Sequence, residues 1–403
     1  MMNKNCLYRI MMTVMLAGVS LAFELPVMAA KSKTVTIDAK PASSTTDDDT
    51  TIINAETTTQ TTETSTQATE AETDDSTDDT LADDGNITSG WNKSMTSYYE
   101  DGEKVTGWKA IDGKLYYFTK KGKLYTKTGM RTIGEKTYYF DDNHYVLSGV
   151  IEADGHSYYF RKKGGARLED KGVNKLDGKF YCVGEGFALE KGWYRDSDNK
   201  RYYFDKKTYE GLTGWNYVGK YKYYFNKKSQ LVQDVRDKLT KKQKKSYKIR
   251  VNRTASCVTV YAKDGAKGYT IPVVAFVCSA GKDTPKGKFE IKDKLRWHEL
   301  MGPCWGQWCM HLTVDILFHS VYYNNEKDNK SLNVSAYNKL GTMASHGCVR
   351  LAAGDCKWIY DNCKVGTKVE IYNNKKNPGP FDKPVPVKLK SGQTWDPTDP
   401  TIK

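Results

Sequence analysis

The chain has 403 residues, enough for two or three domains. Its formal net charge is +13, but residues 41–85 carry thirteen acidic and no basic side chains, which leaves +26 on the remainder. So basic a remainder favours an anionic partner, and the absence of a long apolar run beyond the N-terminus excludes a multi-span membrane protein.

Residues 1–30 have the pattern of a secretory signal peptide. Lys4 and Arg9 give a positive start, an apolar run follows, and small residues predict cleavage after Ala29 or Ala30. An uncleaved anchor is the alternative, but the apolar run is shorter than the ~20 residues that a spanning helix needs. We therefore expect a secreted protein without a transmembrane segment after cleavage.

Residues 31–89 form an acidic, threonine-rich stretch with no aromatic side chain between residues 38 and 88. Such a composition cannot bury enough apolar surface to fold, so the stretch is predicted to be a disordered linker. A specific binding segment is the alternative.

A triplet rich in Tyr and Phe then recurs six times between residues 90 and 232, at intervals of 22, 20, 22, 22 and 21 residues. A glycine followed by an apolar residue precedes each triplet. A turn such as Asp112-Gly113 separates this pair from the triplet, which is the pattern of a hairpin. One hairpin cannot bury its aromatic face alone, so the period predicts a β-hairpin solenoid. The triplets are centred on Tyr117, Tyr139, Tyr159, Tyr181, Tyr203 and Tyr224.

These units resemble the cell-wall-binding repeats of choline-binding proteins and clostridial toxins. The resemblance implies adhesion to the cell wall, and an aromatic cage for choline in some members. Tryptophan follows the glycine only at Trp108, Trp193 and Trp215, which argues against choline. We expect a glycan or anionic cell-wall polymer as the ligand, whereas most of the aromatic side chains are expected to form the solenoid core.

A linker at residues 233–246 leads into a region with a different periodicity. Residues 247–251, 258–261 and 271–278 read as strands joined tightly enough for a mainly antiparallel sheet or sandwich. A short helix is expected from residue 354 to 363, and a closing strand ends near residue 371. The Pro- and Lys-rich tail, residues 374–403, is expected either to lack structure or to pack on this domain.

The stretch from Ser345 to Leu351 contains Ser-His-Gly-Cys. A cysteine is nucleophilic as its thiolate, and a nearby imidazole can lower the thiol pKa or accept the proton. We expect Gly347 to let the backbone turn sharply, so that amides near Cys348 can hold an oxyanion. A buried structural cysteine is the alternative reading.

This motif, together with the Thr-Pro-x-Gly turn at Thr284, resembles the catalytic domain of L,D-transpeptidases of the YkuD type. The resemblance implies a mostly β, sandwich-like domain over residues 247–373. It assigns Cys348 as nucleophile and His319 as its base or thiolate partner. The remaining implied roles are orientation of His319 by Ser320, bracing of the site by His346, binding of the oxyanion by backbone amides near Gly347 and Cys348, and substrate binding by Arg350 and Ser345.

The histidine assignment departs from the family pattern, because 25 residues separate His319 from Ser345 and the family spacing is shorter. A polar insertion around residues 322–331 accounts for the excess, and His311 is a weaker candidate. The tryptophan-rich stretch 296–310 corresponds to the family's lid, or else forms a local cluster. Cys304, Cys309 and His311 lack the second ligand pair of a structural zinc site.

The resemblance implies a secreted, cell-wall-associated peptidoglycan L,D-transpeptidase that makes 3–3 cross-links through a thioester acyl-enzyme. Peptidoglycan stem peptides would be both donor and acceptor, with no metal or organic cofactor and no nucleic-acid partner. An L,D-carboxypeptidase and a non-enzymatic wall-binding protein are the alternatives.

Overall fold

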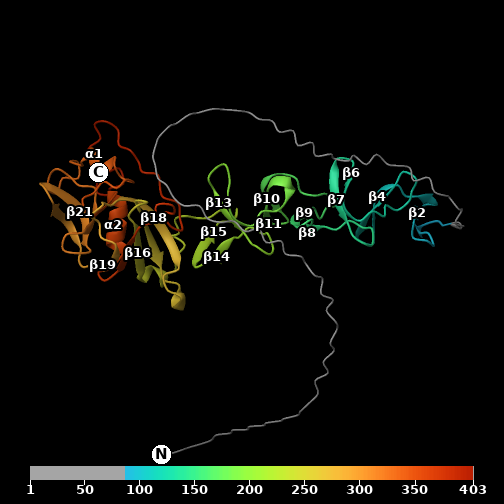
Figure 1. The fold of residues 1–403 in the computed structure, drawn as a ribbon, viewed down its shortest axis with the longest axis horizontal. Helices are drawn as coiled ribbons and strands as arrows, with labels where there is room; N and C mark the ends of the chain where they lie inside the picture. The colour runs from blue at the N-terminus through green and yellow to red at the C-terminus, as the bar shows by residue number, and fades with distance from the viewer. Residues whose placement is uncertain (1–86, 403) are drawn as a thin grey trace, which may run out of the picture. The chain divides into compact units, whose positions relative to one another are not determined.

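The computed structural model describes residues 87–402 (Figure 1). The predicted signal peptide and nearly all of the predicted linker lie outside these residues. Within them, no helix combines the length and apolar character needed to cross a membrane.

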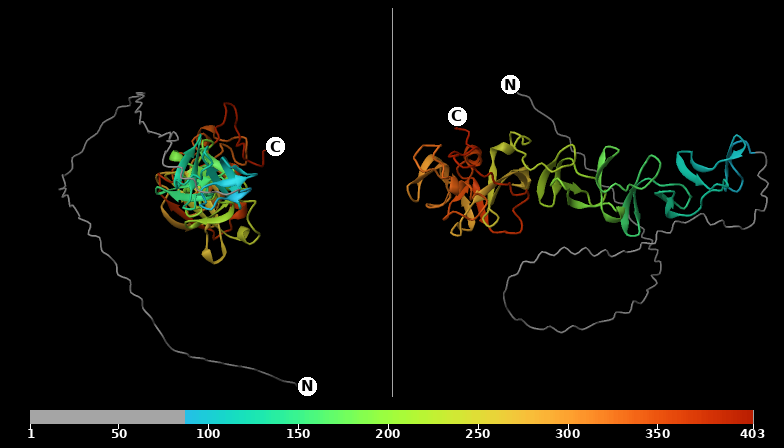
Figure 2. Two further views of the ribbon diagram at one scale, coloured as in Figure 1. Left: turned by 90° about the vertical axis from the view of Figure 1, so that its right-hand side faces the viewer. Right: turned by 90° about the horizontal axis from the view of Figure 1, so that it is seen from above.

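The repeat region begins with a three-stranded sheet of β1 (Gly90–Trp91), β2 (Tyr98–Glu100) and β3 (Glu103–Lys104). Six antiparallel hairpins then follow in chain order, which confirms the predicted repeats, and the right-hand view of Figure 2 shows the same succession. The hairpins are β4 (Gly107–Ile111) with β5 (Lys114–Phe118), β6 (Gly129–Ile133) with β7 (Lys136–Phe140), β8 (Gly149–Ala153) with β9 (His156–Phe160), β10 (Gly172–Leu176) with β11 (Lys179–Val183), β12 (Gly192–Arg195) with β13 (Arg201–Phe204), and β14 (Gly214–Val218) with β15 (Tyr221–Phe225).

Local sequence explains both the turns and the stacking of the hairpins. Asp112 and Gly113 have φ of 51° and 77°, the left-handed pair that a tight two-residue hairpin turn requires. The phenylalanine that ends a triplet is fully buried wherever it occurs, as at Phe118 and Phe225. The amide of Leu231, which follows the last hairpin, donates to the carbonyl of Arg201 in the preceding hairpin at 2.7 Å. The Gly211 amide likewise donates to the Phe180 carbonyl, so backbone hydrogen bonds join successive units.

The last hairpin, β14–β15, contacts the domain that follows. The Tyr217 hydroxyl donates to Asp264 at 2.5 Å, and the Lys222 amide donates to the Thr270 carbonyl at 2.9 Å. Tyr223 also packs within an apolar cluster that includes residues of the following domain.

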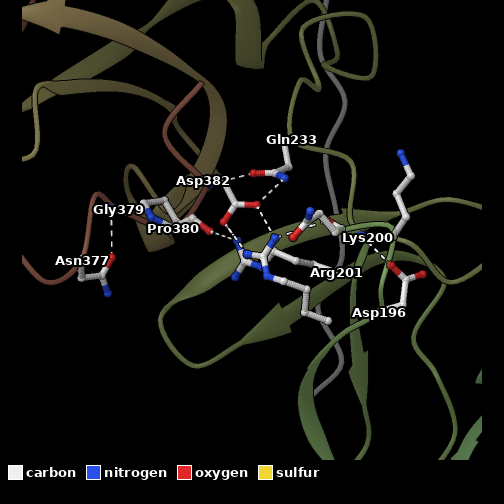
Figure 3. Close-up of polar contacts among 10 residues, drawn as sticks. Asp196, Lys200, Arg201, Gln233, Asn377, Gly379, Pro380 and Asp382 are labelled. Atoms are coloured by element: carbon white, nitrogen blue, oxygen red, sulfur yellow. Dashed lines mark hydrogen bonds and ion pairs between the residues drawn. The ribbon is translucent and has the colours of Figure 1, made fainter. Parts of the chain in front are cut away.

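The C-terminal tail is packed against the protein over residues 374–402. Phe381 is buried in the same apolar cluster as Tyr223. The Asp382 carboxylate accepts hydrogen bonds from Arg195 at 2.7 Å and from Gln233 at 2.8 Å, and it lies 3.4 Å from Arg201 (Figure 3). The tail therefore joins the fifth hairpin to the domain, which the unpatterned tail sequence did not predict.

The C-terminal domain is built on one nine-stranded sheet in the order β19-β24-β16-β17-β18-β23-β22-β21-β20. β16 pairs in parallel with β24, and β22 pairs in parallel with β23, while the other neighbours are antiparallel. The strands are β16 (Tyr247–Asn252), β17 (Cys257–Ala262), β18 (Ile271–Ser279), β19 (Gly287–Glu290), β20 (Leu295–Leu300), β21 (Cys304–His311), β22 (Leu317–Ser320), β23 (Val349–Leu351) and β24 (Lys368–Tyr372).

The sheet curls around one apolar core, which confirms the mainly β prediction. Residues from both halves of the sheet, such as Val260 and Phe318, belong to this core and are fully buried. The helix α2 (Ala353–Asn362) packs on it through Cys356 and Ile359. A second short helix, α1 (Val334–Tyr337), and the 3₁₀ turns η1 (Glu185–Phe187), η2 (Gln243–Lys245) and η3 (Gly265–Lys267) complete the described elements.

Two regions of this domain differ in detail from the predictions. The stretch expected to form a lid or a local cluster is largely the hairpin β20–β21 at one edge of the sheet. The segment read as a polar insertion contains Tyr323, which is fully buried and forms β-bridges with Trp305 and Leu332. Among residues 87–402, all eight cysteines are unbonded thiols.

The stability of this domain should depend on the protonation of Asp355, in the first turn of α2. Burial, followed by the charge of Asp396, raises the pKa of Asp355 to about 7. The folded protein therefore holds a proton that the unfolded chain loses between about pH 4 and pH 7, so the unfolding free energy falls as the pH rises through this window.

Replacing Asp355 with asparagine is expected to raise the unfolding free energy at pH 8 by up to about 4 kcal/mol, with little gain at pH 4. Denaturant unfolding at both pH values measures the difference. Asp361→Asn, on the exposed side of the same helix, is the control. An equal gain at both pH values would contradict the account.

Candidate active site

The residues of the Ser-His-Gly-Cys motif and His319 converge where β22 and β23 run in parallel. His319 lies opposite Arg350 in this pairing, so both side chains point to the same face of the sheet. Cys348 directly precedes β23, and its sulfur lies beside the amide of Leu317, two residues before His319 on β22. The intervening residues Phe318 and Val349 point to the other face and are fully buried in the core.

Two hydrogen bonds fix the loop that carries the cysteine. The Ser345 hydroxyl donates to the Cys348 carbonyl at 2.6 Å. The Thr284 hydroxyl donates to the Gly347 carbonyl at 2.6 Å and accepts from the Gly281 amide at 2.8 Å. The two sequence motifs, which lie about sixty residues apart, are thus in direct contact.

The two glycines beside this loop serve to allow close packing. A Cβ on Gly281 would lie 2.1 Å from the Ser345 carbonyl oxygen. The backbone bends at Gly347, as expected, but without a positive φ. Its lack of a side chain instead makes room for Ile316, whose terminal carbon would lie 2.7 Å from a Cβ.

Cys348 rests as a thiol in this environment. Its side chain is partly buried, and its sulfur donates a hydrogen bond to the Asp315 carbonyl at 3.5 Å. Burial raises the pKa of Cys348, and this effect outweighs the Leu317 amide and the Arg350 charge, which act to lower it. Attack on a carbonyl therefore requires a base that takes the thiol proton.

His319 is a neutral imidazole with a fixed orientation. Its Nδ1 lies 2.6 Å from the Ser320 carbonyl oxygen, which can only accept, so Nδ1 carries the proton and Nε2 is the basic nitrogen. The residue is only 2% exposed. Burial, followed by the charge of Arg350, lowers the pKa of His319 to about 3. The resting pair is therefore a thiol and a neutral imidazole, with no ion pair between them.

The remaining predicted residues differ in their contacts. The Ser320 hydroxyl bonds to the Val321 carbonyl and the Gln307 amide, so Ser320 orients His319 only through its carbonyl. Arg350 donates to the Ala344 carbonyl at 3.0 Å, and its buried Nε has no partner among the described residues. His346 was expected to brace the site. It is exposed, and its ring makes no hydrogen bond to the described residues.

The sequence did not indicate two glycines, Gly281 and Gly306, that pack directly against residues of the site. Gly281 directly follows an apolar strand, and no local pattern indicates that it packs against a loop sixty residues away. Gly306 packs against His319, because a Cβ there would lie 3.1 Å from the histidine Cβ. Thr284 was recognised as part of a motif, but its bond to Gly347 could not be read from the sequence.

Replacing Thr284 with valine is expected to lower the unfolding free energy by about 1–3 kcal/mol. Thr284 is fully buried, and valine keeps its shape while leaving the Gly281 amide and the Gly347 carbonyl without partners. Denaturant unfolding measures the loss, and Thr284→Ser, which restores the hydroxyl, is the control. A valine variant as stable as the serine variant would show that these hydrogen bonds contribute nothing.

Comparison with known families agrees with this geometry. Residues 246–371 match the L,D-transpeptidase catalytic domain (YkuD), residues 127–171 match a choline-binding repeat, and residues 106–124 match a cell wall binding repeat. The chain therefore contains one region that matches a YkuD-type L,D-transpeptidase domain and, before it, regions that match choline-binding-type repeats.

Individual relatives cover only parts of the chain. YciB of Bacillus subtilis, described as a putative L,D-transpeptidase, is 37% identical over 119 residues, which is 28% of this chain and 59% of YciB. Choline binding protein F from Streptococcus pneumoniae is 27% identical over 33% of this chain and 45% of its own, with a TM-score of 0.27. An L,D-transpeptidase from Stackebrandtia nassauensis is 21% identical over 35% of this chain and 62% of its own, with a TM-score of 0.24.

Proposed function

We propose that this protein is a secreted, cell-wall-associated L,D-transpeptidase that forms 3–3 cross-links in peptidoglycan through Cys348. The observation that carries the proposal is the position of Cys348 beside the Leu317 amide of β22, two residues before the buried, neutral His319, in a domain that matches the L,D-transpeptidase type. Such a pair can attack an amide carbonyl without a metal ion.

In the acylation step, the Cys348 sulfur attacks the carbonyl that links a diamino-acid residue to the terminal D-Ala of a donor tetrapeptide. His319 Nε2 takes the thiol proton as the carbon–sulfur bond forms, and it gives this proton to the departing D-Ala nitrogen. Backbone amides near Gly347 and Cys348 are the proposed donors to the oxyanion. The product is a thioester on Cys348 and free D-Ala.

The side-chain amine of an acceptor stem peptide then attacks the thioester carbonyl and releases the Cys348 thiolate. We propose that Arg350 and Ser345 contribute to substrate binding. Ser345 acts through the loop that it fixes, whereas the guanidinium group of Arg350 is the proposed partner of a donor carboxylate.

The repeats would hold the enzyme at the cell wall. Trp108 and Tyr138, with ring centres 4.4 Å apart, line a hollow of about 660 Å³. Its other lining residues carry both signs of charge, because Arg161 is paired with Asp170 and Arg167 with Glu169, a polar and aromatic lining that suits a glycan. At another repeat the guanidinium of Arg201 lies 4.5 Å from the centre of the Trp193 ring, where a ligand cation would otherwise stack. These features favour a glycan or anionic polymer over choline.

Analysis of muropeptides after expression of the wild type and of Cys348→Ala in a host without other L,D-transpeptidases tests the proposal. We expect new cross-linked dimers with the wild type alone. Conversion of tetrapeptide to tripeptide stems without dimers would indicate the carboxypeptidase instead. No change in either product would contradict an enzymatic role.

A further inference from the structure

The strand β21 changes direction at Trp308, and this change gathers several polar side chains beside His319. Trp308 has φ of 56°, which is rare for a residue with a large side chain. As a result Cys309 lies on the same side of the strand as Gly306: a Cβ on Gly306 would lie 3.0 Å from the Cys309 sulfur and 3.2 Å from His319 Nδ1. The end of β21 therefore faces the catalytic side.

His311, at the end of β21, lies level with Cys348 across the sheet. It pairs with Leu317 of β22, which points to the same face as His319. Phe318 pairs with Val349, the first residue of β23, and the Leu317 amide lies beside the sulfur of Cys348, so Leu317 is level with Cys348 just before that strand. Two strand spacings separate His311 from Cys348, so their Cα atoms lie about 10 Å apart.

His311 forms a second acid–base pair that the acylation chemistry does not use. Its Nδ1 lies 2.9 Å from both carboxylate oxygens of Asp293, and its amide donates to the same carboxylate at 3.1 Å. An ionised carboxylate only accepts, so Nδ1 carries a proton, and Nε2 is the ring nitrogen that takes no part in this contact. Burial alone would raise the pKa of Asp293, but the hydrogen bonds from His311 outweigh it and lower the pKa.

A further imidazole connects this pair to the catalytic histidine. The ring of His298 meets the ring of His311 edge-on, with centres 5.2 Å apart. His298 pairs with Gly306 across the β20–β21 hairpin, and Gly306 packs on His319. The Asp293 side chain is 47% exposed and the His311 side chain 16% exposed, so a substrate can reach both.

We infer that Asp293 and His311 form the site that receives the acceptor amine and takes its proton. The inference rests on the proposed function. An alkyl amine has a pKa near 10 and arrives as an ammonium ion, which cannot attack a thioester until it loses a proton. The Asp293 carboxylate attracts the cation, and His311 Nε2 is the base that faces the same side of the sheet as Cys348.

The three ammonium protons are accounted for in this step. One passes to His311 Nε2, and the freed nitrogen attacks the thioester carbonyl carbon. As the carbon–nitrogen bond forms and the carbon–sulfur bond breaks, a second proton passes through His319 to the Cys348 thiolate. The third stays on the amide nitrogen of the cross-link, and His311 later releases its proton to solvent.

The test uses the full protein with a synthetic tetrapeptide stem as donor and acceptor. Intact mass at early times measures the acyl-enzyme, and chromatography measures the ratio of cross-linked dimer to hydrolysed tripeptide. In His311→Gln we expect acyl-enzyme formation within about twofold of the wild type and a dimer-to-tripeptide ratio lower by about 100-fold. Asp293→Asn should lower the ratio less, and His156→Gln, in an exposed part of the third repeat, should not change it.

Two results would overturn the inference. One is an unchanged ratio in both variants. The other is a parallel fall in acyl-enzyme formation, because the pair would then serve the donor half of the reaction. Intact mass of the wild type shows whether an acyl-enzyme forms at all, before the products are compared. If none forms, both the proposed function and this inference are overturned.

Discussion

Replacing His319 with glutamine is expected to slow thioester formation by about 10²–10⁴-fold while leaving the protein folded. The glutamine amide can still donate to the Ser320 carbonyl, so the contact that orients the ring has a substitute. It offers no basic nitrogen, however, and burial keeps the Cys348 thiol protonated. The rate of D-Ala release from a tetrapeptide measures the loss.

The matched control is Ser320→Ala. It removes the hydroxyl but keeps the carbonyl to which His319 is bound, so D-Ala release should fall only a few-fold. The buried Gln307 amide loses its acceptor, which should lower the unfolding free energy by about 1–3 kcal/mol. Similar losses of activity in the two variants would mean that the serine hydroxyl takes part in catalysis, contrary to this account.

Replacing Gly281 with alanine is expected to reduce D-Ala release by about 100-fold or more, because displacements of about 1 Å at a reacting group have effects of this size. The new Cβ would lie 2.1 Å from the Ser345 carbonyl oxygen and 2.8 Å from its carbon. Both are backbone atoms of the loop that carries Cys348, so the loop itself has to move. Activity and thermal unfolding should be measured together to separate displacement of the loop from unfolding.

Gly347→Ala gives the contrast within the same loop. There the added Cβ meets the terminal carbon of Ile316 at 2.7 Å, and the end of a flexible side chain can move away. We therefore expect a much smaller loss than for Gly281→Ala. Equal losses of activity would show that a clash with backbone atoms has no larger effect than a clash with the end of a side chain, contrary to this account.

The repeats were predictable from the sequence because each hairpin depends on local signals. Asp112-Gly113 sets a turn and the following aromatic triplet supplies a strand, and the same pair of signals recurs at a fixed period. The strands of the catalytic domain were predictable for a similar reason: the alternation from Tyr247 to Val251 extends over most of β16.

The interior of the site was less predictable because it depends on contacts between distant segments. The bond from Thr284 to Gly347 and the close packing of Gly281 on Ser345 join residues that no local pattern relates. The left-handed conformation of Trp308 moves His311 to the catalytic side, and a tryptophan gives no sign of it. The tail shows no periodicity, yet Asp382 ties it to the fifth hairpin.

The central claim is that Cys348 carries the acyl group of the reaction. Incubation of the full protein with a tetrapeptide donor, followed by intact mass and peptide mapping, tests this claim directly. The account predicts one adduct, on the peptide that contains Cys348, formed with release of D-Ala and absent in Cys348→Ala. Release of D-Ala by Cys348→Ala at the wild-type rate, or an adduct on another residue, would contradict it.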